Sequence, residues 1–191
     1  MSIIQEGSPA FPKSKNVLID TNVLYWLTYA NSRVFPRNLK PKEYQLEKYP
    51  RLFEQLLENQ NTIYFSSYSI SELASIIARV EASLNGKGQE FERKSWLKKE
   101  GGREIVVREL SMVIQSIESW AGLLNTHPPM PPSDYLNVYS QLYLDGYDIY
   151  IQNEISQNNV KYLLTDDIDF MSVPHLNIIT ANPNASKYKV L

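Results

Sequence analysis

Acidic side chains follow two expected strands that lie far apart in the chain. Asp20 comes directly after the apolar run 17–19, and Asp167 comes shortly after the apolar run 162–164. In a parallel α/β sheet, residues just past the carboxyl ends of the strands line the ligand crevice. We therefore expect both carboxylates in one negatively charged pocket, which would attract a hard cation.

Glu72 is the third acidic candidate, because it belongs to the first turn of a helix expected at 69–84, directly after a strand expected at 62–66. This places it at the same edge of the sheet. Taken alone, Ser69 and Glu72 equally fit a capping box, in which Ser69 is the N-cap and the glutamate reaches back to its amide.

Asp148 is the fourth candidate, near the start of a helix expected at 147–157. About eleven helical residues cover ~16 Å, close to the ~20 Å of a six-residue strand, so the start of this helix returns to the edge where the next strand ends. Asp148 also shares an i, i+3, i+7 stripe with Ile151 and Ile155, which turns the carboxylate inward.

Each acid also has a structural interpretation without chemistry. Asp20 fits the N-cap of a helix at 21–30, and the acids at 166, 167 and 169 fit a turn. The presence of all four acids at one edge of the sheet favours a metal site over these separate structural roles. Without cysteine or a histidine pair, carboxylates suit Mg²⁺ or Mn²⁺ rather than zinc, and such ions support hydrolysis of phosphodiesters by activated water.

The expected strands and helices that position these acids alternate along the chain, and this alternation predicts a parallel sheet covered by helices on both faces. We expect one domain over 16–183, with an insertion at 85–104, a flexible N-terminal tail over 1–15 and a C-terminal tail over 184–191. The expected strands are 17–20, 62–66, 160–165 and 176–180, and the expected helices are 21–30, 43–59, 69–84, 104–124, 133–144 and 147–157.

Composition narrows the class of protein. The 191 residues carry 19 basic and 21 acidic side chains, so no global positive field points to a polyanionic partner. The absence of cysteine excludes disulfides, zinc–thiolate sites and cysteine nucleophiles. With no apolar run that could serve as a signal peptide or span a bilayer, we expect a cytoplasmic protein with no membrane partner.

The ordered motifs resemble the PIN-domain family of metal-dependent ribonucleases, which includes the VapC-type toxins of bacterial toxin–antitoxin pairs. The resemblance implies a three-layer α/β/α sandwich with a central, mainly parallel sheet. It also implies that Asp20, Glu72, Asp148 and Asp167 bind the metal, while Asp166 stays ambiguous. The matching pieces are Asp20-Thr21-Asn22, Ser71-Glu72-Leu73, Asp148 and the run from Thr165 to Phe170.

The same resemblance implies supporting roles and partners. Asn22 and Thr165 would support the ligands by hydrogen bonding, and Asp169 would be a fifth, outer metal ligand. The expected partner is an RNA substrate, with an antitoxin protein and a second copy of the chain as further candidates. The alternative function is a non-catalytic PIN-like module that binds RNA or a protein.

A charged segment at 87–104 is the candidate for holding RNA against the repulsion of an acidic site. Lys94, Lys98 and Arg103 could contact phosphates, and Trp96 or Phe91 could stack on an unpaired base. Because glutamates are interleaved with these cations, a solvated charged helix is the competing interpretation.

Overall fold

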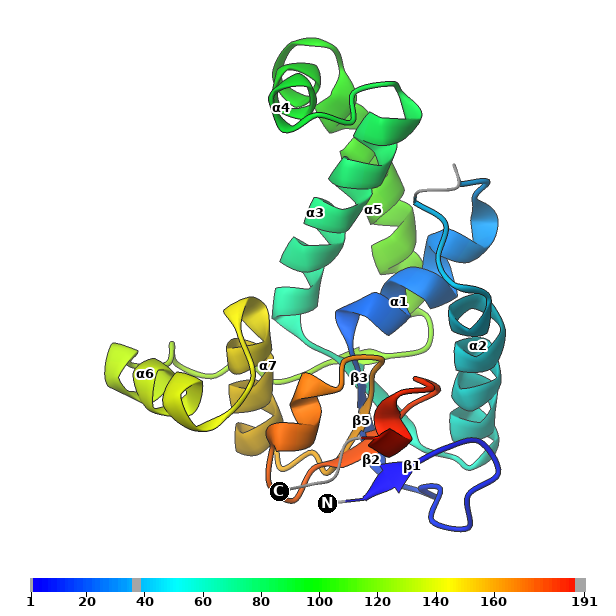
Figure 1. Cartoon of the computed structure of the whole chain (residues 1–191), viewed down its shortest axis with the longest axis vertical. Coiled ribbons are helices and arrows are strands. Elements are labelled where there is room, and N and C mark those ends of the chain that lie inside the picture. Colours follow the sequence, from blue (N-terminus) through cyan, green and yellow to red (C-terminus); the bar gives the residue numbers. More distant parts are fainter. Residues whose placement is uncertain (1, 36–38, 188–191) are drawn as a thin grey trace.

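The computed structural model describes residues 2–35 and 39–187, so the end of the expected C-terminal tail, 188–191, lies outside the described residues. A six-stranded parallel sheet forms the centre, in the order β1-β6-β5-β2-β3-β4 (Figure 1). This confirms the predicted α/β sandwich with a parallel sheet. The strands are β1 (Ile3–Ile4), β2 (Asn16–Ile19), β3 (Thr62–Phe65), β4 (Gly122–Leu123), β5 (Tyr162–Leu164) and β6 (Asn177–Ile179).

Helices cover both faces of this sheet. β2 shows the two layers directly, because Val17 and Ile19 pack into one buried cluster while Leu18 packs into the other. No helix among the described residues is both long enough and apolar enough to cross a bilayer. The α-helices are α1 (Thr21–Thr28), α2 (Glu43–Glu58), α3 (Ser67–Leu84), α4 (Glu90–Lys99), α5 (Gly102–Glu118), α6 (Pro132–Gln141) and α7 (Gly146–Gln157).

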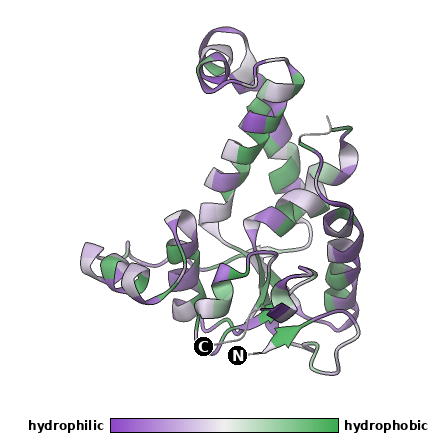
Figure 2. Ribbon diagram, viewed as in Figure 1, coloured by the Kyte–Doolittle hydropathy of each residue, from purple (hydrophilic) through white to green (hydrophobic). Residues whose placement is uncertain are grey.

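Two short edge strands were not predicted. The helix expected at 104–124 ends at Glu118, and β4 follows it and pairs with β3. Ile3 and Ile4, expected in a flexible tail, instead pair with β6 as β1, which has the hydrophobic colour in Figure 2. A strand of two residues has no detectable periodicity, so only its tertiary partner identifies it.

The segment expected as an insertion contains α4, which lies at the far end of the paired helices α3 and α5 (Figure 1). Trp96 is only 3% exposed there, so the expectation that it could stack on a base is wrong. Lys94 pairs with Glu90 one turn away at 2.7 Å, while Phe91 remains exposed. α4 is therefore docked through Trp96 rather than free in solvent.

Gly102 is the close neighbour that lets Trp96 dock. A Cβ atom at Gly102 would lie 2.4–2.7 Å from three atoms of the indole ring. Gly102→Ala should therefore destabilise the protein by about 1–3 kcal/mol through overpacking, although alanine normally favours a helix. Urea unfolding measures this change.

Gly122→Ala is the matched control, because its Cβ would meet the Tyr64 ring at an ordinary 3.5 Å. If Gly102→Ala is as stable as this control, Trp96 does not pack on α5 as described.

Candidate active site

Asp20 lies at the junction of β2 and α1 and is almost completely buried. Its Oδ1 accepts a hydrogen bond from the Thr21 backbone N–H at 2.7 Å, so it is the N-cap of α1. Its Oδ2 accepts a hydrogen bond from the Thr165 hydroxyl at 2.8 Å. Burial, with added repulsion from Glu72 and Asp167, raises the pKa of Asp20 to about 7, although Thr165 opposes the rise.

Glu72 is held by α1 rather than by its own helix. The Thr21 hydroxyl donates a hydrogen bond to Glu72 Oε2 and lies 3.0 Å from the Ser69 hydroxyl. α3 begins at Ser67, with Ser66 as its N-cap, so the capping-box interpretation of Ser69 and Glu72 is wrong. Burial is the main cause that raises the pKa of Glu72.

Asp148 occupies the first turn of α7, as the sequence predicted, and is half-buried. Burial, together with repulsion from neighbouring carboxylates, raises its pKa to about 8. The neighbours that do so are Asp20, Asp167, Glu72 and Asp145, in order of decreasing effect. Asp148 therefore lies within electrostatic range of the other three candidate ligands.

Asp167 is fixed by the loop after β5. Its backbone N–H donates to the Thr165 hydroxyl at 2.9 Å, and its Oδ1 accepts from the Asp169 N–H at 2.8 Å. Burial raises the pKa of Asp167, and Asp169 adds repulsion. Thr165 therefore connects the loop that carries Asp167 to the carboxylate of Asp20, while Asp169 lies at the exposed edge.

Asp166 has a structural role, which resolves its ambiguity. Its carboxylate accepts hydrogen bonds from the Tyr49 hydroxyl at 2.7 Å, from the Tyr44 hydroxyl at 2.9 Å and from Gln45 Nε2 at 3.1 Å. All three donors belong to α2, and Tyr49 is fully buried. The side chains of the two adjacent aspartates therefore have different partners. Asp166 binds α2, whereas Asp167 accepts a hydrogen bond from Asp169 within its own loop.

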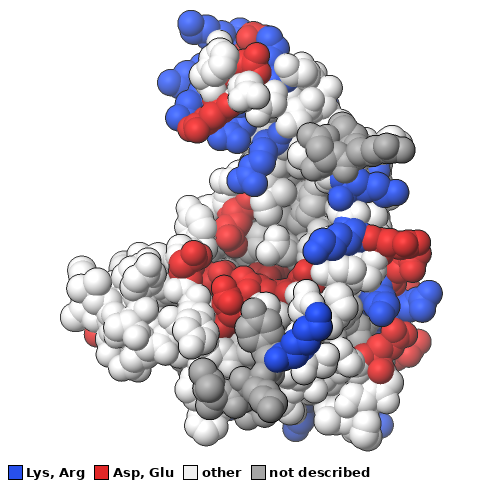
Figure 3. Space-filling view, in the orientation of Figure 1, with Lys and Arg blue, Asp and Glu red and all other residues white. Residues whose placement is uncertain are grey.

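Two of the four acids, Asp20 and Asp167, follow strands β2 and β5, while Glu72 lies on α3 and Asp148 at the start of α7. Figure 3 shows a band of acidic side chains at the foot of α3, beside the start of α1. A set of carboxylates that raise one another's pKa fits a divalent cation chemically, since bound charge would relieve the repulsion. Among the described residues, however, no three acidic or histidine side chains lie close enough to form a ready-made metal site.

Glu154 is a buried acid that the sequence interpretation did not single out. It accepts hydrogen bonds from the hydroxyls of Ser66 and Ser67, at 2.5 and 3.1 Å, and so ties α7 to the start of α3. This contact sets where α7 places Asp148 relative to Glu72. The signal available in the sequence was an acid beside Ile155 on the apolar stripe of α7.

The remaining predicted site residues are not brought together with the four acids. Asn22 is exposed, and its side chain forms no hydrogen bond with any described residue. Lys94 and Lys98 belong to α4 and Arg103 to the start of α5, so all three lie at the far end of α3 and α5 (Figure 1), away from the acidic band that Figure 3 shows. Their roles stay predictions.

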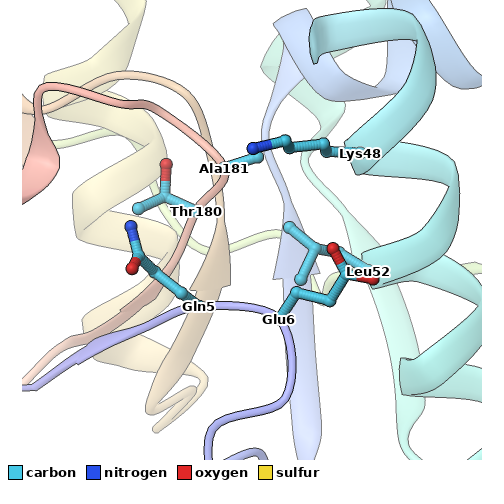
Figure 4. A pocket seen from close by; sticks show the side chains of 6 residues that line it. All are labelled: Gln5, Glu6, Lys48, Leu52, Thr180 and Ala181. Atoms are coloured by element: carbon cyan, nitrogen blue, oxygen red, sulfur yellow. The ribbon is translucent and has the colours of Figure 1, made fainter.

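A polar pocket of about 250 Å³ lies at the carboxyl ends of β1 and β6, beside α2 (Figure 4). Thr180, in its wall, lies 3.1 Å from the Tyr49 hydroxyl that also binds Asp166. The four acids do not line this pocket. Its lining residues are Gln5, Glu6, Lys48, Leu52, Thr180 and Ala181.

Comparison with known proteins gives a likeness of fold. No protein-family model matches the sequence, and neither does any curated protein. A solved structure of VapBC2 from Rickettsia felis, bound to a DNA fragment from its promoter, is similar to this chain, with a TM-score of 0.50 and 17% identity. The match covers 86% of this chain and 98% of the other. It agrees with the PIN-like architecture that the motifs imply.

The raised pKa values of the acids predict a pH-dependent stability. A folded pKa of about 7 or 8, against an ordinary 3.8, means that the folded state binds more protons, so stability falls as pH rises from about 4 to 8. Asp148→Asn should remove part of this fall. We expect a metal-free Tm close to that of the wild type near pH 5, but higher by about 2–4 °C near pH 8.5, for a relief of about 1 kcal/mol.

Asp166→Asn is the control, since its carboxylate faces α2. Thermal melts in chelator measure both variants. A pH dependence of Tm that is identical in Asp148→Asn and the wild type would place Asp148 outside the acidic set.

Thr165 should stabilise the strand ends through its hydroxyl. Thr165→Val removes the donor to Asp20 and the acceptor of the Asp167 N–H at nearly constant volume, and should cost about 1–3 kcal/mol. Thr165→Ser keeps the hydroxyl and should cost only about 0.8 kcal/mol for the lost methyl group. Urea unfolding compares the two, and a serine variant less stable than the valine variant would contradict this role.

Proposed function

We propose that the chain is an endoribonuclease that depends on Mg²⁺ or Mn²⁺. The observation that carries this proposal is the interaction of four acids from separate segments: Asp20, Glu72 and Asp167 all raise the pKa of Asp148, and Glu72 and Asp167 raise that of Asp20. Such crowding of carboxylates costs stability, which favours a role that uses their charge.

The four acids would hold the ion, with Asp169 as an outer ligand. A bound Mg²⁺ or Mn²⁺ would lower the pKa of an attacking water and stabilise the leaving oxygen of the phosphodiester. Thr165 and Thr21 would keep Asp20 and Glu72 oriented, since their hydroxyls already donate to these carboxylates. The protein would need no nucleophilic side chain of its own.

The partner is the second part of the proposal. The similar solved structure is of VapBC2, and the family that the motifs resemble includes VapC-type toxins. We propose accordingly that an antitoxin protein binds this chain. Co-purification of the chain with the product of a small neighbouring open reading frame tests that partner.

One observation favours a second candidate, a PIN-like module that binds RNA or a protein without cutting. In the part of the chain that the structure describes, the acids are not arranged as a preformed metal site. Under the nuclease proposal, the side chains close around the ion when it binds.

Cleavage of RNA separates the two functions. The purified protein should cut RNA when Mn²⁺ is added and lose this activity in EDTA. Asp20→Asn should reduce the rate by at least about 100-fold, the usual order for losing one electrostatic contact to the transition state. Gel analysis of labelled RNA measures the rate.

Asp166→Asn serves as the matched control, because it changes the charge of a neighbouring acid that contacts α2. Its activity should stay within a few-fold of the wild type. Cleavage that persists in EDTA, or in Asp20→Asn, would exclude the proposed site, and no cleavage in any metal would favour the binding module.

A further inference from the structure

Tyrosine rings form a continuous row beside the acidic site. Ring centroids are 5.1 Å apart for Tyr68 and Tyr150, and 5.6 Å apart for Tyr150 and Tyr135. Tyr139 extends the row with its ring nearly parallel to Tyr135 at 6.2 Å, and Tyr147 branches from Tyr68 at 6.3 Å. The row therefore connects α3 and α7 to α6.

The row begins at the carboxylates. Tyr68 lies one helical turn before Glu72 on α3, and Tyr147 directly precedes Asp148 on α7. Figure 1 shows α6 projecting from α7 on the side away from α1 and α2. A polymer with one phosphodiester at the acids could therefore continue along the tyrosines.

Two members of the row are open to solvent, Tyr139 at its far end and Tyr147 beside the acids, and the chain around them carries no lysine or arginine. Tyr139 is 57% exposed and Tyr147 is 43% exposed, and α6 contains no buried residue. The sequence has no lysine or arginine between Arg108 and Lys161. Figure 3 shows the projecting part of the molecule around α6 as almost entirely uncharged, next to the acidic band.

From this geometry we propose that the tyrosine row is the stacking platform for unpaired nucleobases of the strand that the acidic site cuts. The proposal rests on the proposed nuclease function and names its substrate class, a single-stranded nucleic acid. Tyrosine faces accept any unpaired base, whereas a paired base in a duplex has no free face.

The distribution of charge around the site explains why stacking, rather than ion pairing, would hold the nucleic acid. The acidic site repels the phosphates that it must bind, and the described cations of α4 lie at the far end of α3. Stacking needs no cation, so it is compatible with the surrounding acids. The row also begins beside the site and continues through successive ring contacts to Tyr139 on α6, which fits a strand better than a compact protein contact.

The test uses Asp20→Asn protein, so that bound RNA is not cut. The probe is a fluorescein-labelled RNA of mixed sequence that cannot pair with itself, together with the same strand in a duplex. Tyr139→Ala should weaken binding of the single strand at least five-fold without changing its salt dependence, because no phosphate contact is lost. Fluorescence anisotropy measures the Kd.

Two matched controls isolate the ring. Tyr139→Phe keeps the aromatic face and should bind the single strand with the same Kd as its parent. Tyr143→Ala removes an exposed tyrosine outside the row and should also leave the Kd unchanged. Crosslinking of a 5-bromouridine-substituted strand should label the peptide that contains Tyr139. The duplex should bind more weakly than the single strand.

The outcomes separate the two proposals. If the wild type cuts RNA but Tyr139→Ala binds the single strand like its parent, the platform is wrong and the nuclease stands. If nothing is cut but binding still depends on Tyr139, the platform stands and the nuclease fails. If Tyr139→Ala changes only the oligomeric state or the capture of a protein, the row is a protein contact and the proposal is overturned.

Discussion

The burial of Asp20 among other carboxylates is the constraint on which the site depends. A carboxylate at the end of a buried strand would be costly alone, and it is tolerated because a backbone amide and the Thr165 hydroxyl both donate to it. Hydrogen bonds to a charged group contribute more than those between neutral groups, so these two donors partly offset the cost of burial. Glu72 and Asp167 add repulsion that the hydroxyls do not remove. The site is thus held in a state that a cation would relax.

The surrounding elements are arranged to keep this state. The parallel pairing of β2 with β5 brings Asp20 and Thr165 to the same edge of the sheet, and Thr21 ties α1 to Glu72 on α3. Glu154 fixes α7 through serine hydroxyls. Asp166 is bound by two tyrosines and a glutamine of α2, and it adds less repulsion to Asp167 than Asp169 does. Each helix that borders the site is therefore anchored by a polar contact as well as by its apolar face.

The sequence predicted the features that are local or periodic. Apolar runs located β2, β3, β5 and β6, and the stripe of Asp148 with Ile151 and Ile155 oriented α7. The sequence did not predict β1 and β4, because two residues have no period, or the burial of Trp96, because it depends on Gly102. The sequence also did not predict that Asp166 and Asp167 would have different partners, since the partners of Asp166 lie about 120 residues away on α2. Tertiary pairing, rather than propensity, decided each of these features.

The most direct test of the central claim is to locate the cation. A crystal of the protein soaked in Mn²⁺, with data collected above and below the manganese absorption edge, would show the ion by its anomalous scattering. We predict a peak about 2.1 Å from carboxylate oxygens of at least two of the four acids Asp20, Glu72, Asp148 and Asp167. Manganese bound only elsewhere, or no peak beside these acids at a concentration that saturates binding in solution, would contradict the account.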